Sequence, residues 1–179
     1  MADTELLYTY FDSPVGKMIV VVNDDGICLL EFEYRKRLQE ELDYLKKEFG
    51  KEIIEGRNEH TENIISQMKE YFVGERRDFD IPLVYAGTDF QKKVWKILEE
   101  IPYGETRSYK AQAIAYGNPE AIRAVAKANG DNRIAVVIPC HRIIGMDGKL
   151  VGYGGGLWRK RWLLNHEQRI LAKQLSLEI

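Results

Sequence analysis

A short apolar run that ends in a proline places the strongest constraint on how this 179-residue chain can fold. Residues 134–138 are all apolar, which predicts a short buried strand. Pro139 ends that strand, because proline cannot donate a hydrogen bond to a sheet ladder. The next three residues are Cys140, His141 and Arg142. The fold must therefore bring a thiol, an imidazole and a guanidinium to the end of a buried segment.

These three side chains allow two interpretations. The thiolate is the nucleophilic form of cysteine, and a neighbouring base or cation favours it, so Cys140 beside His141 is a candidate nucleophile with its base. The alternative is a small buried cysteine followed by a solvent-facing His-Arg pair, which is the commoner arrangement for an isolated cysteine. The surrounding sequence has to decide between them.

Cysteine content and hydropathy limit the compartment and the cofactors. The chain has only Cys28 and Cys140, which suits a reducing compartment rather than a disulfide framework. Neither belongs to a CxxC or Cys/His cluster with metal-ligand spacing, so we expect no zinc or other metal site. No apolar run is long enough to span a bilayer, and residues 1–5 carry no signal-peptide pattern. We therefore expect a cytoplasmic protein that does not bind membranes.

The charges are distributed unevenly along the chain. Residues 1–87 carry a net charge of −8, whereas residues 88–179 carry +6. This asymmetry predicts that only the second half meets a polyanion such as nucleic acid. Ordinary variation between surface segments is the alternative explanation.

The first half is typical of a small α+β unit, and its sequence shows no group of catalytic or ligand-binding residues. Its patterns predict three strands, two helices and a further short strand: 5–11, 17–22, 27–32, then 35–49 and 61–72, then 81–83. Turn sequences at 13–16 and 23–26 separate the first three strands. The segment 82–88 is the expected domain boundary. This places an N-terminal domain at 1–86 and a C-terminal domain at 87–179.

The second half contains a candidate helix-turn-helix. Thr88 can cap a first helix that ends before residue 102. A short helix at 108–116 and another at 120–128 follow, joined by a tight Gly-Asn-Pro turn. Two short Ala-rich helices with such a turn are typical of DNA-binding units, although an ordinary helical hairpin is as common.

The second helix of this pair carries one long basic side chain among small ones. Arg123 lies between Ala121 and Ala124 in the sequence, so the helix could sit deep in a groove while the arginine reaches between the bases. Such an arginine could replace a base that has been extruded from the stack. A solvated surface arginine is the alternative.

A glycine-rich stretch and a final helix complete the chain. Residues 152–156 read Gly-Tyr-Gly-Gly-Gly, which suits a loop whose backbone approaches a ligand closely. The helix expected at 157–170 has Trp162, Leu163 and Leu164 facing inward. Its basic residues 159–161 would face outward, either as phosphate contacts or as a solvated charge run.

These motifs, in this order and spacing, resemble the O6-alkylguanine-DNA alkyltransferases (methylated-DNA–protein-cysteine methyltransferases). The resemblance covers residues 90–167 and loosely includes the strand-then-helix order of the first half. The matching residues are Ser108-Tyr109, Gly117-Asn118-Pro119, Arg123-Ala124-Val125, Asn132, Pro139-Cys140-His141-Arg142, Tyr153-Gly154-Gly155-Gly156 and Trp162-Leu163-Leu164.

The resemblance implies a fold and an activity. The fold is α+β, with a ribonuclease-H-like N-terminal α/β domain followed by a winged-helix-like (helix-turn-helix) C-terminal domain. The activity is DNA repair by an enzyme that moves the alkyl group of O6-methylguanine in double-stranded DNA irreversibly to Cys140, in a single turnover. The resemblance also leads us to expect action on O4-methylthymine and no cofactor. We expect a monomer with no obligate protein partner, because the sequence has no obvious self-pairing stripe.

The resemblance also implies roles around the thiol. His141 would take the thiol proton through a water, and Glu167 would hold that imidazole in its tautomer. Asn132 would anchor the water and the nearby backbone. Tyr109 would donate a hydrogen bond to the departing guanine.

Further residues are assigned to the substrate and to DNA. Tyr153, Gly154 and Gly155 would wall the pocket, and the carbonyls of Cys140 and Ile143 would bind the exocyclic amine of guanine. Ser108 is placed with this substrate-binding group. The residues expected at the DNA are Arg123, Ala121, Ala124 and Tyr109.

Some features depart from the family pattern or favour another function. Gly154 stands where many relatives have serine, and Arg133 and Ala135 replace prolines, which should alter the stiffness of that loop. The competing function is a non-catalytic helix-turn-helix protein that recognises alkylated bases or regulates transcription; the presence of Cys140 argues for the enzyme. A third possibility, a Cys-His hydrolase, is weak, because the sequence has no Gly-rich oxyanion loop before Cys140. We expect Arg142 to form a structural ion pair.

Overall fold

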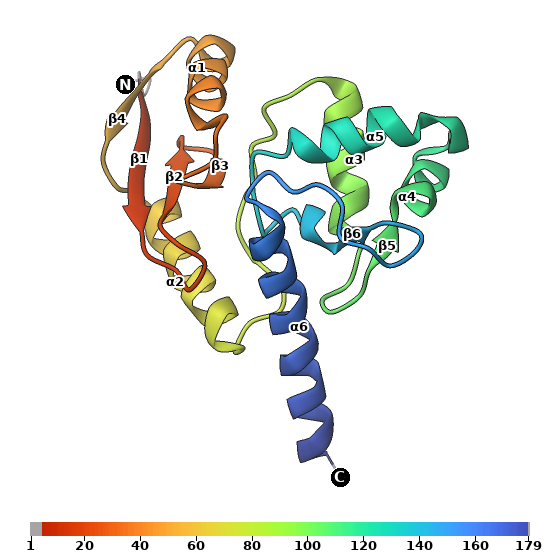
Figure 1. The fold of residues 1–179 in the computed structure, drawn as a ribbon. Helices are drawn as coiled ribbons and strands as arrows, with labels where there is room; N and C mark the ends of the chain where they lie inside the picture. The colour runs from red at the N-terminus through yellow and green to blue at the C-terminus, as the bar shows by residue number, and fades with distance from the viewer. Residues whose placement is uncertain (1–4, 179) are drawn as a thin grey trace. The chain divides into compact units, whose positions relative to one another are not determined.

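The computed structural model describes residues 5–178, and the chain divides into two compact units (Figure 1). Unit 1 consists of the chain up to residue 86 together with residues 133–135. Unit 2 consists of residues 87–132 and the chain from residue 136 onward. Most of the amino-terminal stretch in which no signal peptide was expected lies outside the described residues.

Unit 1 is built on a four-stranded sheet. Its strands are β1 (Glu5–Phe11), β2 (Met18–Val22), β3 (Ile27–Phe32) and β4 (Glu52–Glu55), in the order β3-β2-β1-β4. The pairs β1–β2 and β2–β3 are antiparallel, whereas β1 and β4 are parallel. The first three strands confirm the sequence prediction. β4 was missed, because its four residues, two isoleucines between two glutamates, give little periodic signal.

The turn between β2 and β3 requires its glycine. The side-chain oxygen of Asn23 accepts hydrogen bonds from the Asp25 and Gly26 amides at 2.9 and 3.0 Å. Gly26 has φ +153°, and a Cβ there would lie 2.3 Å from the Pro82 carbonyl oxygen. That carbonyl accepts from the Ile27 amide at 2.9 Å. The close approach of the two backbones therefore excludes any side chain at position 26.

Two helices pack on this sheet. They are α1 (Leu38–Phe49) and α2 (Glu59–Val73). Both were expected, although α1 begins three residues later than its apolar spacing indicated. Asn58 and Thr61 form a reciprocal capping box that starts α2. The short strand expected at 81–83 is reduced to one bridge, between Ile27 and Leu83. One cluster of the buried core of this unit comprises Leu6, Ile19, Val21, Cys28, Leu29, Leu45 and Ala86.

The apolar run before Cys140 is buried, but it is not the strand that its composition predicted. The Leu30 amide donates to the Arg133 carbonyl at 2.9 Å, and the Ala135 amide donates to the Leu30 carbonyl at 2.8 Å. This single bridge draws residues 133–135 into unit 1. Val136 then has φ +71°, and a strand cannot continue through a left-handed backbone. Residues 135–138 therefore form turns and a bend.

Unit 2 begins with a cluster of three helices, α3 (Asp89–Glu99), α4 (Tyr109–Tyr116) and α5 (Ile122–Gly130). Thr88 and Ser108 cap the first two, as expected. The last helix begins as a separate 3-10 turn, η1 (Pro119–Ala121), instead of starting directly at residue 120. The core of the cluster comprises Val94, Ala113, Val125 and Ala128.

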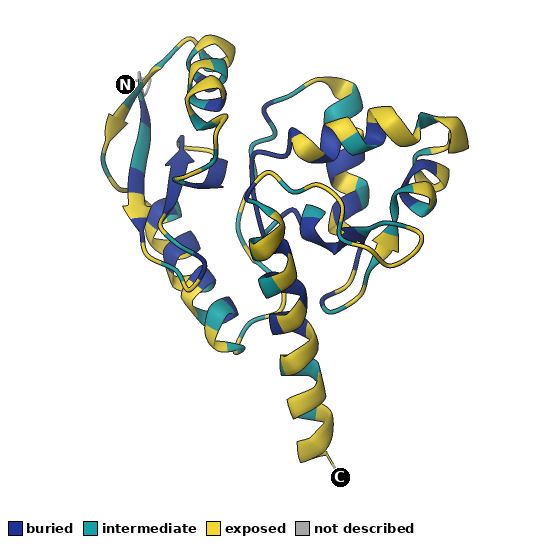
Figure 2. Cartoon of the chain, in the orientation of Figure 1, coloured by how far each residue is buried: buried dark blue, intermediate teal, exposed yellow. Residues whose placement is uncertain are grey.

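The rest of unit 2 carries the thiol and a long helix. The 3-10 turn η2 (Cys140–Arg142) leads into β6 (Ile143–Ile144), which pairs in parallel with β5 (Arg107–Ser108). The final helix, α6 (Leu157–Leu177), is 21 residues long and exposed over its last turns (Figure 2). None of the helices within residues 5–178 is both long enough and apolar enough to cross a membrane.

A buried amide pair between α4 and α5 generates a stability prediction. Gln112 and Asn129 exchange two hydrogen bonds of 2.7 and 2.6 Å and are 2% and 7% exposed. Gln112→Leu should lower the free energy of unfolding by about 1–3 kcal/mol, because it leaves the Asn129 amide buried without its partner. Urea unfolding measures this loss. The double variant Gln112→Leu/Asn129→Leu should recover part of it, and a single variant as stable as the wild type would contradict the prediction.

Candidate active site around Cys140

Cys140 begins the turn η2 and is the partly exposed member of the Cys-His-Arg sequence. Its amide donates to the Ile138 carbonyl at 2.8 Å, across Pro139. Its thiol lines a surface pocket, whereas His141 and Arg142 are buried. This is the reverse of the alternative in which the cysteine is buried and the other two face solvent.

The Asn132 side chain joins the turn to the thiol. Its Nδ2 donates to the Ile138 carbonyl at 2.8 Å and lies 3.3 Å from Cys140 Sγ. The residue is only 2% exposed, so the amide is held in place. A hydrogen-bond donor directed at sulfur favours the negatively charged form of the thiol.

Glu167 connects the imidazole and the guanidinium. His141 Nε2 lies 2.8 Å from Glu167 Oε1. Arg142 donates to both carboxylate oxygens, from Nε at 3.0 Å and from Nη2 at 2.9 Å. The Gly104 amide donates to Glu167 Oε2 at 3.1 Å. The ion pair expected for Arg142 is thus present, with Glu167 as its partner.

The charges of this cluster follow from its burial and its contacts. Burial lowers the pKa of His141, although Glu167 partly opposes this, so the imidazole is neutral at pH 7. Burial alone would raise the pKa of Glu167, but His141 and Arg142 together hold it well below its usual range. An ionised carboxylate accepts from Nε2–H, which leaves Nδ1 as the basic nitrogen. That Nδ1 is buried and has no hydrogen-bond partner among the described residues.

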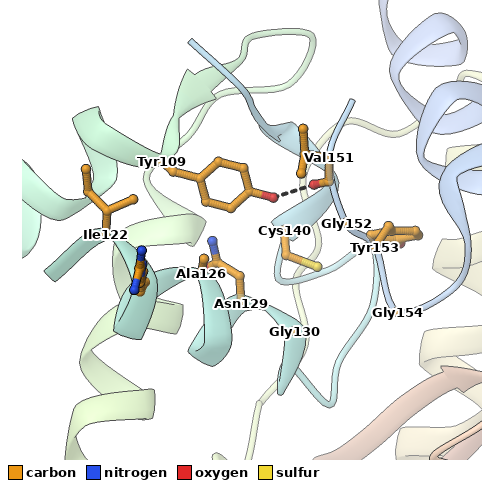
Figure 3. A pocket seen from close by; sticks show the side chains of 11 residues that line it. Tyr109, Ile122, Ala126, Asn129, Gly130, Cys140, Val151, Gly152, Tyr153 and Gly154 are labelled. Atoms are coloured by element: carbon orange, nitrogen blue, oxygen red, sulfur yellow. Dashed lines mark hydrogen bonds between the residues drawn. The ribbon is translucent and has the colours of Figure 1, made fainter. Parts of the chain in front are cut away.

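The pocket beside Cys140 has a volume of about 360 Å³. Figure 3 shows its side chains, which come from α4, from α5, from the thiol turn and from residues 151–154, here called the pocket loop. The lining residues are Tyr109, Ile122, Arg123, Ala126, Asn129, Gly130, Cys140, Val151, Gly152, Tyr153 and Gly154. The expected Tyr109, Arg123, Tyr153 and Gly154 are therefore brought together with the thiol.

Tyr109 is bonded to the pocket loop. Its hydroxyl donates to the Val151 carbonyl at 2.6 Å, drawn as the dashed line in Figure 3. Burial raises the pKa of Tyr109, and the nearby Cys140 raises it further. The phenol therefore keeps its proton at neutral pH and can act as a donor.

Several expected site residues do not line this pocket. Ser108 Oγ accepts from the Ala111 amide at 3.0 Å and so caps α4. Ile143 is buried in β6, and Gly155 is also buried. Ala121 and Ala124, which were expected at the DNA, lie at the start of α5 with Ala124 exposed.

Helical spacing could have revealed the pocket residues that the sequence reasoning missed on α5. Ile122, Ala126 and Asn129 follow at intervals of four and three, which places them on one helix face. The loop residues Val151 and Gly152 carry no comparable signal.

Lys160 was expected to face outward with its basic neighbours, and this was wrong. Its side chain is fully buried. Nζ lies 3.3 Å from the Val151 carbonyl and 3.2 Å from the Gly152 carbonyl. The spacing of Lys160, Leu163, Leu164 and Glu167 places all four on the buried face of α6. Burial lowers the pKa of Lys160 to about 8.

The other two basic residues of this run differ from Lys160. Arg161 is exposed, as expected. Arg159 is half-buried, and its Nη1 donates to the Gly155 carbonyl at 2.8 Å. Only the exposed member of the run is free to serve as a phosphate contact. Within residues 5–178, no group of three His, Cys, Asp or Glu side chains could hold a metal ion.

Two family models together cover most of the chain. Residues 6–85 match the ribonuclease-like domain of 6-O-methylguanine DNA methyltransferases. Residues 89–169 match the DNA-binding domain of the same proteins. The fold class expected from the sequence is thereby confirmed.

Named relatives and solved structures agree with these models. The methylated-DNA–protein-cysteine methyltransferase of Methanosarcina barkeri is 44% identical over 168 residues, covering 93% of this chain and 99% of the relative. The constitutive enzyme of Bacillus subtilis is 40% identical over 166 residues, covering 90% and 94%. The crystal structure of Mycobacterium tuberculosis OGT in complex with DNA aligns with a TM-score of 0.79 and 40% identity, covering 92% and 94%. This chain therefore belongs to the methylated-DNA–protein-cysteine methyltransferase family.

Proposed function

We propose that this protein repairs DNA by moving the alkyl group of O6-alkylguanine to its own Cys140, once per molecule. One observation carries the proposal: the Cys140 thiol lines a pocket of about 360 Å³, and the buried Asn132 side chain lies 3.3 Å from its sulfur. The family to which the chain belongs supports the same chemistry. No cofactor takes part, because the protein itself is the acceptor.

The first step is removal of the thiol proton. His141 Nδ1 is the free basic nitrogen, since Nε2–H is engaged by Glu167. A water between the thiol and Nδ1 would relay the proton, and the Asn132 amide would stabilise the sulfur anion. The ionised Glu167 then stabilises the imidazolium that forms.

The second step breaks the bond between O6 and the alkyl carbon. A lone pair of Cys140 Sγ forms the new S–C bond, and the electrons of the broken bond remain on guanine. Tyr109 would turn its hydroxyl from Val151 toward the leaving base and donate as that charge develops. The thiol proton finally resides on guanine, so the products are a neutral base and an S-alkylcysteine.

The substrate must reach the pocket out of the duplex. Arg123 lies on the pocket rim, is exposed and makes no ion pair with any residue in the described range, so it is free to enter the DNA stack. It would fill the gap left by the flipped nucleotide. O4-methylthymine presents the same alkoxy group and is a second substrate of this proposal. The protein would act as a monomer in the cytoplasm, where its two free cysteines stay reduced.

Intact-mass spectrometry tests the transfer. Incubation with a duplex containing O6-methylguanine should add one methyl group, about 14 Da, to Cys140 through attack by its thiolate. Cys140→Ala should gain no mass yet still bind the duplex. A wild-type protein that binds the duplex without gaining mass would instead support a non-catalytic DNA-binding function.

Arg123→Ala should slow repair in duplex DNA roughly tenfold or more, because each 1.4 kcal/mol of lost flipping energy is a factor of ten. Its reaction with free alkylated guanine base should stay near the wild-type rate. Single-turnover rates on both substrates make the comparison. Lys127→Ala, which removes another exposed charge from the same helix, is the matched control. Equal losses on duplex and free base would refute the role in flipping.

Glu167→Gln should lower the rate of alkyl transfer roughly 100-fold, in the range that general-base catalysis contributes. It should also change how stability depends on pH. The pKa of Glu167 in the folded protein lies below its usual value of 4.5. Its stabilising contribution is therefore complete above about pH 4.5 and is lost as the pH falls below that value.

Denaturant unfolding between pH 3 and pH 7 measures this effect. The wild type should lose stability on acidification, whereas Glu167→Gln should start about 3 kcal/mol lower at pH 7 and lose less. Glu178→Gln, at an exposed acid just beyond the same helix, should behave like the wild type. Parallel pH curves for wild type and Glu167→Gln would show that the carboxylate is not held ionised by its partners.

A further inference from the structure

Lys160 is a buried cation that takes part in neither step of the proposed reaction. Its side chain is fully buried on α6, among the largest buried side chains of the described residues. A lysine is almost never buried to this extent unless its ammonium group is compensated. Here the compensation comes from two backbone carbonyls, those of Val151 and Gly152, at 3.3 and 3.2 Å.

Both carbonyls belong to the pocket loop. The Val151 carbonyl also accepts the Tyr109 hydroxyl at 2.6 Å, so one oxygen joins the lysine, the loop and the tyrosine. A carbonyl oxygen has two lone pairs and can accept both donors at once. When Tyr109 turns toward a bound base, Lys160 can therefore still hold Val151 in place.

We propose that Lys160 is a positioning residue for alkyl transfer, whose buried ammonium pins the pocket loop through the carbonyls of Val151 and Gly152. This inference rests on the proposed function of the pocket. The ammonium group holds two consecutive residues of the loop that lines one side of the base-sized cavity. Loss of the charge leaves the loop without this anchor, so the pocket binds the alkylated base less tightly.

The charge also makes the pocket sensitive to alkaline pH. The titratable groups that face Lys160 are Cys140 and His141 from the thiol turn and Tyr109 from α4. The Tyr109 ring centre lies 5.8 Å from Nζ. Burial lowers the pKa of Lys160 to about 8, so the ammonium is lost as the pH rises above that value, and the neutral amine that remains holds the two carbonyls less strongly.

Stability and function should respond in opposite directions. The unfolded chain, with the usual lysine pKa of 10.5, binds a proton more tightly than the folded chain does. The charged Lys160 therefore costs folding stability below about pH 8, and that cost disappears between about pH 8 and 10.5. If Lys160 were kept only for stability, its charged form would instead stabilise the folded protein, and stability would fall as the lysine lost its proton.

The experiment compares wild type with Lys160→Met, which has similar length and no charge, and Lys160→Arg, which keeps the charge. The probe is the nucleoside O6-benzyldeoxyguanosine, and benzyl transfer to Cys140 is followed by intact mass at increasing probe concentration. Lys160→Met should raise the half-saturating concentration roughly tenfold or more, since charge-assisted hydrogen bonds to the loop are lost. Lys160→Arg should restore most of this loss.

Melting temperatures and a matched control show whether a rise in the half-saturating concentration comes from the lost loop contacts or from lost stability. Lys160→Met should melt at the wild-type temperature or above it. Lys173→Met, an exposed lysine of the same helix, should leave half-saturation unchanged. A Lys160→Met protein with wild-type half-saturation, or one whose only defect is a lower melting temperature, would overturn the proposal.

Two further measurements test the charge of Lys160 and its hold on the loop separately, and the second does not depend on catalysis. In the wild type, the half-saturating concentration should rise as the pH passes from 7 to 9.5, whereas Lys160→Arg should show no such rise. Hydrogen exchange of the backbone amides at 151–154, without substrate, should be faster in Lys160→Met. Equal exchange would refute the pinning of the loop, whereas a wild type that accepts neither methyl nor benzyl groups would refute the proposed function instead.

Discussion

The geometry of the reactive centre depends on one buried carboxylate. Glu167, fully buried on α6, accepts hydrogen bonds from His141, Arg142 and the Gly104 amide. Arg142 in turn donates from Nη1 to the Ile101 carbonyl at 2.7 Å. The cluster therefore ties the thiol turn to the last helix and to the segment after α3. A buried charge without these partners would be strongly unfavourable, so the cluster forms as a whole or not at all.

The same cluster decides the chemistry of the imidazole. Because Glu167 stays ionised and engages Nε2–H, the proton of His141 is fixed on Nε2, and Nδ1 is left as the basic nitrogen. Burial keeps the ring neutral, so Nδ1 can accept a proton at physiological pH. The thiol itself remains partly exposed, because Pro139 and the short 3-10 turn carry it to the pocket wall.

Helix α6 contributes two buried charges of opposite sign, two turns apart. Glu167 is compensated by two side chains and a backbone amide, whereas Lys160 is compensated by backbone carbonyls of the pocket loop. Both residues belong to the buried stripe of the helix, where leucines would pack without cost. This face of α6 therefore holds the thiol turn and the pocket loop by polar contacts as well as packing against the core.

Local sequence patterns predicted much of this protein correctly. The first three strands, both helices of unit 1 and the caps at Thr88 and Ser108 follow from alternation, helical spacing and capping chemistry, which act over a few residues. Of the residues that the motif around Cys140 and the Tyr-Gly-rich loop suggested, Cys140, Tyr153 and Gly154 line one pocket. The strands, helices and caps depend on residues that are close in the sequence, so the sequence alone determines them.

Tertiary contacts decided the remaining features. Residues 134–138 have the composition of a strand, but one bridge to Leu30 and the left-handed Val136 turn them into a loop. Lys160 carries a charge typical of surface residues. It is nevertheless buried, because it lies on the buried face of α6 and two carbonyls of the pocket loop accept hydrogen bonds from its ammonium group. Hydropathy could not reveal either outcome, because each depends on partners that the chain brings together only when it folds. A polar group is buried only where hydrogen-bond partners are available to it, and these partners are a property of the whole fold.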